Sequence, residues 1–154
     1  MKKILIYGYG NPGRQDDALA NKLVDMLQDW IEEYTIEGVA TDSNYQLNIE
    51  DAEIISHYDI VFFADASTED INDVLLTEVE PNNSKVEFSM HAVSPAYVLD
   101  LCSKMYNKTP KTYLLHIKGY EWEFMEEMTK KAESNLNDAF SLMKYKILGA
   151  LHLA

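Results

Sequence analysis

Residues 4–17, ILIYGYGNPGRQDD, decide the fold of this chain: an apolar run, a glycine-rich turn and a pair of acids follow one another. The apolar run predicts a buried strand at 4–8, and the glycines predict a tight turn. A helix is expected over 17–34, because apolar residues recur there on one helical face. A strand that passes through a turn into a helix is the first unit of a parallel α/β sheet.

Strands and helices alternate along the rest of the chain, which predicts a single domain over 1–154 with a mostly parallel sheet and helices on both faces. Residues 59–65 are apolar on both faces and predict a central strand. Ser94 and Pro95 suit the N-cap and first position of a helix. Further strands are expected at 34–40, 74–79 and 112–118, an extended segment at 85–90, and further helices at 49–58, 94–105 and 124–151.

The stretch between Asp65 and His91 has no helical pattern that could carry a parallel crossover. It contains two extended pieces instead, at 74–79 and 85–90. In the simplest connection, the chain forms an antiparallel edge strand with one piece and returns along the other. This path brings His91 back to the sheet edge at which Asp65 ends its strand.

Composition and charge narrow the class of protein. Hydrophobic residues make up 47% of the 154 residues, which allows a sizeable core, and the net charge is -13. Such a charge repels phosphate groups, so we expect neither nucleic acid nor an anionic membrane as a partner. The single cysteine, Cys102, permits no internal disulfide and agrees with a reducing compartment. The apolar run at 4–7 is too short for a signal peptide or a membrane span, so we expect a cytoplasmic protein.

The turn contains the pattern G-x-G-x-x-G at Gly8, Gly10 and Gly13, which is typical of dinucleotide-binding turns. Such a turn presents main-chain N–H groups to a pyrophosphate at the start of the helix. Asp16 and Asp17 lie at that start and would repel phosphate, so a nucleotide-binding domain is the less favoured hypothesis. Acids also cap helices, and one acid is enough for that role. The other acid is expected to point into a site.

Three residues are candidates for chemistry at the carboxyl edge of the sheet, where the sites of open α/β sheets lie: Asp17, Asp65 and His91. Each has a structural alternative when taken alone: capping of the helix for Asp17, capping of the turn at 67–70 for Asp65, and an ordinary structural role for His91. Together they bring two carboxylates and one imidazole to one edge. That donor set suits a borderline divalent ion such as nickel or zinc, with positions left open for water or substrate.

In their order and spacing, these segments resemble the hydrogenase maturation endopeptidases over nearly the whole chain. The segment G-x-G-N-P-x-R-x-D-D at 8–17 resembles that family's opening motif, and residues 59–66 resemble its central strand ending in an acid. Ser89 and His91, ahead of a helix, resemble its histidine segment. Ile117 and Gly119, before the last helix, resemble its C-terminal part.

The resemblance implies a three-layer α/β/α fold of the phosphorylase/hydrolase-like kind, with a five-stranded mixed sheet in which one strand is antiparallel. It also implies that Asp17, Asp65 and His91 bind a metal, and it leaves Asp16 as a cap and support. The implied activity is removal of the C-terminal extension from the large-subunit precursor of a nickel–iron hydrogenase after nickel insertion. The nickel would arrive with the precursor, zinc or another divalent ion could replace it in vitro, and the enzyme would act as a monomer.

Four positions depart from the family's opening motif: Gly13, Gln15, Ala18 and Ala20. None of them removes a ligand, so the departures concern the shape of the loop and the choice of hydrogenase. In the implied protease, a metal could polarise the scissile carbonyl or activate water, and a carboxylate could serve as base. A second hypothesis is a non-catalytic module that binds the nickel-loaded precursor without cutting it. Both hypotheses use the same three ligands.

Overall fold

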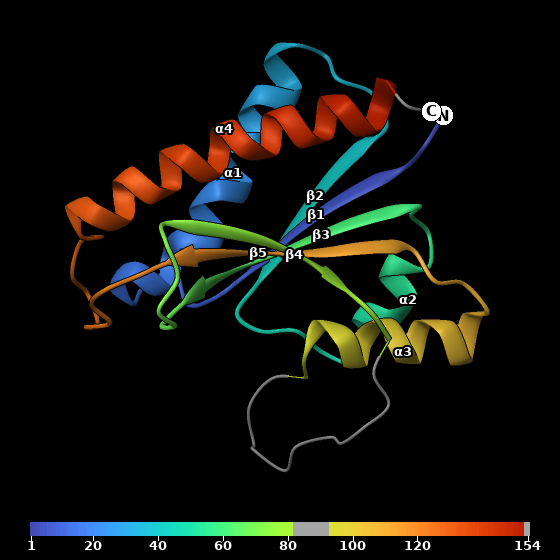
Figure 1. The fold of residues 1–154 in the computed structure, drawn as a ribbon, viewed down its shortest axis with the longest axis horizontal. Helices are drawn as coiled ribbons and strands as arrows, with labels where there is room; N and C mark the ends of the chain where they lie inside the picture. The colour runs from blue at the N-terminus through green and yellow to red at the C-terminus, as the bar shows by residue number, and fades with distance from the viewer. Residues whose placement is uncertain (82–92, 153–154) are drawn as a thin grey trace.

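The structure is a computed structural model that describes residues 1–81 and 93–152. A five-stranded sheet lies between two helical layers, with α1 and α4 on one face and α2 and α3 on the other (Figure 1). This arrangement confirms the predicted three-layer α/β/α fold with a mixed sheet. None of the helices in the described part of the chain is both long and apolar enough to cross a membrane.

The strands follow the order β2-β1-β3-β5-β4 across the sheet. β1, β2, β3 and β5 run parallel, and β4 pairs antiparallel with β5 at the edge, as the path inferred from the sequence requires. The predicted extended segment at 85–90 lies outside the described residues. The strands are β1 Ile4–Tyr9, β2 Val39–Asn44, β3 Ile60–Ser67, β4 Val74–Val79 and β5 Lys111–Lys118.

The helices are the short 3-10 helix η1 Gln15–Ala18, α1 Leu19–Glu33, α2 Asp51–Ile55, α3 Pro95–Tyr106 and α4 Lys130–His152. The predicted cap of α3 is confirmed, because the Ser94 hydroxyl accepts a hydrogen bond from the Tyr97 main-chain nitrogen at 3.1 Å. Cys102 is buried in α3, as expected for a core residue.

Alternating side chains of the strands divide the core into two parts. Ile4, Ile6 and Phe62 face α1 and α4, whereas Leu5 and Phe63 face α2 and α3. Because β1 and β3 are buried on both faces, they form the centre of the sheet. Their carboxyl ends therefore lie next to each other at one edge.

The predicted second strand is displaced along the sequence: β2 occupies 39–44 and not 34–40. The main chain turns sharply between α1 and β2, with a positive φ of 48° at Thr35 and of 88° at Gly38. Neither conformation is compatible with a strand. Val39 is the first residue free to pair, and it lies opposite Ile4.

Helix boundaries differ at three places. The first helix opens with the 3-10 turn η1, and α2 is shorter than the predicted 49–58. The last helix begins at Lys130 and not at residue 124, although its apolar periodicity extends further back. The cause lies in the segment 119–129, whose main-chain groups bond to the loop after β1 and not to a helix of their own.

Candidate active site at the carboxyl edge of the sheet

The loop after β1 packs closely against the start of α1. A Cβ atom on Gly8 would lie 2.6 Å from the Ala20 carbonyl oxygen, and one on Gly10 would collide with the Asp17 carbonyl oxygen. Glycine at these two positions therefore allows the close approach of strand and helix. This approach places η1, and with it Asp17, directly at the carboxyl edge.

The main-chain N–H groups of this loop are used inside the protein. The Asn11 nitrogen donates to the Asp17 carboxylate at 2.9 Å, and the Gly13 nitrogen donates to the Asn11 side chain at 2.9 Å. The Gly10 nitrogen donates to the Asn44 carbonyl at 3.0 Å. A pyrophosphate needs such N–H groups for itself. Because the Asp17 carboxylate, the Asn11 side chain and the Asn44 carbonyl already occupy these N–H groups, the geometry argues against nucleotide binding at the glycine pattern.

Asp65 lies near the end of β3, in register with Tyr9 at the end of β1. Burial, followed by the negative charge of Asp17, raises the pKa of the Asp65 carboxyl from 3.8 to about 7. The charge of one carboxylate can act on the other in this way only when the two are near neighbours. Asp17 and Asp65, predicted separately from the sequence, thus lie near each other at the carboxyl edge.

Tyr9 is a component of this edge that the sequence reasoning missed. Its side chain is buried on the same face of the sheet as Asp65, and hydrogen bonding between its hydroxyl and the Asp65 carboxylate lowers the pKa of Asp65. Burial, followed by the charge of Asp65, raises the pKa of the Tyr9 hydroxyl well above its usual value. Tyr9 therefore remains a neutral hydroxyl beside the Asp65 carboxylate. The signal available in the sequence was the position of Tyr9 directly after the predicted strand at 4–8.

The third predicted residue, His91, lies outside the described residues. Within 1–81 and 93–152, no three His, Cys, Asp or Glu side chains gather closely enough to hold a metal ion. His116 lies in register with Asp65 on β5, but its Nε2 atom is 3.1 Å from the Thr77 hydroxyl. Burial lowers the pKa of the His116 imidazole, which favours the neutral form.

Asp16 does not cap a helix, contrary to the expectation from the sequence. Neither η1 nor α1 has a side-chain cap. The fully buried Asp16 carboxylate accepts main-chain hydrogen bonds from Tyr120 at 2.8 Å, Glu121 at 3.1 Å and Thr129 at 2.8 Å, and another from the Thr129 hydroxyl at 2.9 Å. Its role is to hold the segment 119–129 against the loop after β1.

Two of the positions that depart from the family motif take part in the same attachment. The Gln15 side-chain oxygen accepts a hydrogen bond from the Glu123 nitrogen at 3.0 Å, and the Gly13 carbonyl accepts one from the Met125 nitrogen at 2.9 Å. Ala20 is buried against Gly8. The departures thus fit a loop that is packed and bonded in this chain's own way.

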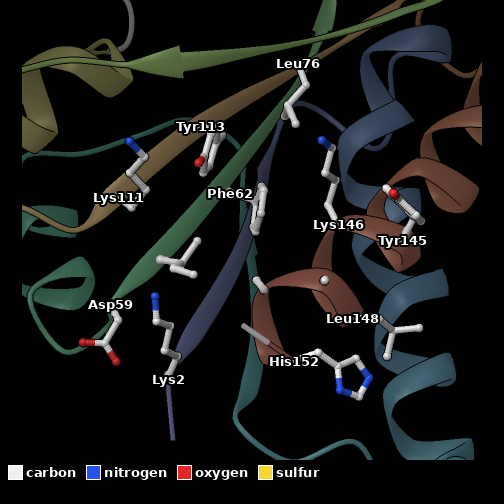
Figure 2. A pocket seen from close by; sticks show the side chains of 13 residues that line it. Lys2, Asp59, Phe62, Leu76, Lys111, Tyr113, Tyr145, Lys146, Leu148 and His152 are labelled. Carbon is white, nitrogen blue, oxygen red and sulfur yellow. The ribbon is translucent and has the colours of Figure 1, made fainter. Parts of the chain in front are cut away.

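A pocket of about 810 Å³ lies at the opposite edge of the sheet, where β3 and β5 begin. Figure 2 shows Phe62 and Tyr113 of the sheet facing Lys146 of α4 across it. Neither Asp17 nor Asp65 lines this pocket. It is therefore separate from the carboxylate pair.

No protein-family model matches the chain, and no curated protein sequence matches it. Solved structures do match, and they show that the chain has the fold of the hydrogenase maturation proteases. The NiFe hydrogenase maturation protease HycI from Thermococcus kodakarensis superposes with a TM-score of 0.72 at 18% identity, over 92% of this chain and 90% of that one. The maturating endopeptidase HybD from E. coli gives a TM-score of 0.69 at 18% identity, over 97% and 92% of the two chains. The hydrogenase 2 maturation peptidase from a Thaumarchaeota archaeon gives 0.65 at 18% identity, over 99% and 100%.

Proposed function

We propose that this protein is an endopeptidase that removes the C-terminal extension of a nickel–iron hydrogenase large-subunit precursor after nickel insertion. The observation that supports the proposal is that the charge of Asp17 acts on Asp65 at the carboxyl edge, in a fold shared with solved hydrogenase maturation proteases. Fold alone does not define a function, so the carboxylate pair provides the chemical part of the argument.

The proposed site binds the nickel that the precursor carries. Asp17 and Asp65 provide oxygen ligands, and His91 joins them on the ground of its place in the sequence. Two neighbouring carboxylates repel each other, and the raised pKa of Asp65 reflects burial first and then this repulsion. A divalent cation between them would relieve the repulsion, which makes the pair chemically suited to a metal.

Each residue of the described site has a separate role in this proposal. The Asn11 main-chain nitrogen holds the Asp17 carboxylate at 2.9 Å, so that Asp17 is oriented before the precursor arrives. Tyr9 orients Asp65 through its hydroxyl. One carboxylate of the pair would accept a proton from the attacking water, and the metal on the precursor would polarise the scissile carbonyl.

The deciding experiment incubates the protein with a nickel-loaded precursor and measures the mass of the product. We expect a shortened large subunit with the wild type and none with Asp65→Asn. Asp70→Asn is the matched control, because Asp70 follows the same strand but its side chain is fully exposed. Binding of the precursor by the wild type without any shortened product would favour the non-catalytic module. Loss of cleavage in the Asp70 control as well would show that the assay does not report on the carboxylate pair.

The proposal includes a monomeric enzyme that works in the cytoplasm on a protein substrate, without nucleic acid or membrane as partner. The net charge of -13 supports the exclusion of polyanionic partners. Light scattering of the purified protein tests the oligomeric state, and a mass of two chains would contradict this part of the proposal.

A further inference from the structure

Two large apolar side chains project into water from the segment between β5 and α4. Phe124 is 67% exposed and Met125 is 95% exposed. Met125 also has a positive φ of 61°, which is unfavourable for a residue other than glycine. We call residues 121–127 the apolar tip. Its conformation brings the apolar surface of Phe124 and Met125 into solvent.

The main chain around the apolar tip is held in place by the loop after β1. The Asp16 carboxylate binds the segment on both sides of the tip, through Tyr120 and Thr129. The Arg14 side chain donates to the Trp122 carbonyl at 2.8 Å, and its guanidinium lies 5.5 Å from the centre of the Phe124 ring. These contacts keep Phe124 and Met125 exposed. Strained or exposed features that the surroundings enforce are typical of functional surfaces.

The apolar tip lies beside the carboxylate pair. Asp16, which binds the segment, directly precedes Asp17 in the sequence. On the other side, the Gly119 nitrogen donates to the carbonyl of Ser67, two residues beyond Asp65, at 3.0 Å. A protein whose cleavage site enters the space at Asp17 and Asp65 would therefore meet the tip at the same time.

The charge on the apolar tip indicates the chemistry of its partner. Four exposed glutamates flank the two apolar residues in the sequence, and the segment 119–129 itself contains no lysine or arginine. A complementary surface has an apolar depression ringed by basic side chains. The glutamates are the rim of this contact, and the apolar side chains are its anchors. The glutamates are Glu121, Glu123, Glu126 and Glu127.

We propose that the apolar tip is the docking surface for the precursor, which it grips through an apolar depression with a basic rim while Asp17 and Asp65 act on the nearby chain. This inference rests on the proposed function, because it takes the precursor as the partner. It adds a surface that determines affinity and choice of substrate without touching the reacting atoms.

The test compares the wild type with the double variant Phe124→Ala, Met125→Ala on the nickel-loaded precursor, measuring both cleavage kinetics and direct binding. Losing two anchors should raise KM and the dissociation constant about tenfold or more and leave kcat within about twofold. Melting temperatures should agree, because both side chains are exposed. Tyr145→Ala is the matched control, since Tyr145 is 74% exposed and lies on α4 at the pocket on the far edge.

The outcomes separate the two proposals. Wild-type cleavage with the same KM in the double variant overturns the docking surface and leaves the protease intact. Absence of both cleavage and binding in the wild type overturns the proposed function, and the docking surface with it. A third outcome is that the wild type forms dimers, the double variant does not, and the KM of the double variant equals that of the wild type. This outcome would assign the tip to a second copy of the chain and contradict the proposal.

Discussion

The Asp16 carboxylate accepts two hydrogen bonds from Thr129, one from the main-chain nitrogen at 2.8 Å and one from the hydroxyl at 2.9 Å. The two residues are 113 positions apart. Their contact joins the turn that carries Asp17 to the segment that precedes α4. It also explains why α4 begins only after Thr129, whose main-chain nitrogen is engaged by Asp16 and not by a helix.

Asp16→Asn should destabilise the protein. The two oxygens of the Asp16 carboxylate accept four hydrogen bonds in the buried site. In asparagine an NH2 group replaces one of these oxygens, and it cannot accept a hydrogen bond. We expect a loss of about 1–3 kcal/mol in the free energy of unfolding, measured with urea. Asp25→Asn on the exposed side of α1 is the control and should change it by about 0.5 kcal/mol or less. Capping, as inferred from the sequence, predicts only a mild effect for Asp16→Asn, so a change as small as that of the control would restore that interpretation.

Asp17→Asn should leave the fold largely intact and weaken nickel binding. The Asn11 nitrogen can still donate to the amide oxygen at position 17, but a neutral amide is a poor ligand for a divalent ion and one negative charge is removed. Calorimetric titration with Ni²⁺ measures the affinity, and precursor cleavage measures the consequence. A variant that binds nickel as tightly as the wild type would remove Asp17 from the set of ligands.

Asp65 should titrate near neutral pH in the metal-free protein. The pKa of its carboxyl is raised from 3.8 to about 7, so between these pH values the folded state holds a proton that the unfolded state has lost. The contribution of this group to the free energy of unfolding therefore falls as the pH rises from about 4 to 7. Over that window, the free energy of unfolding of Asp65→Asn should increase relative to that of the wild type. Carbon NMR of labelled aspartate measures the midpoint directly. Asp17→Asn should move the midpoint down, and a midpoint near 4 in the wild type would contradict the raised pKa of Asp65.

His91→Ala should abolish processing and leave stability almost unchanged, by about 1 kcal/mol or less. The sequence places His91 between two elements and not on an apolar face, so the change removes little core volume. Specific activity of the folded protein and its melting temperature are the two measurements. A variant that unfolds easily while its folded fraction keeps full activity would make His91 a structural residue.

Much of the fold was predictable from local patterns. The apolar strands β1 and β3 and the antiparallel edge strand β4 were expected, and Val74–Val79 matches its predicted bounds. Displacement of β2 was not predictable, because the residues at 34–38 alternate well enough for a strand while positive φ values at Thr35 and Gly38 exclude one. These conformations turn the chain after α1 back toward the sheet, so that Val39 can pair with Ile4.

The sequence by itself determined the α/β architecture and the positions of Asp17 and Asp65, because both depend on short-range periodicity and on the rule that parallel strands end at a common edge. Only the tertiary structure decided that Asp16 is a clamp and not a cap, that Tyr9 orients Asp65, and that residues 119–129 form a loop. Helical periodicity continues through Met125 and Met128, but the buried Asp16 carboxylate takes the Thr129 main-chain donor that a helix beginning at residue 124 would need. A charged acceptor forms stronger hydrogen bonds than a neutral carbonyl, and no pattern in the segment itself reveals an acceptor more than a hundred residues away.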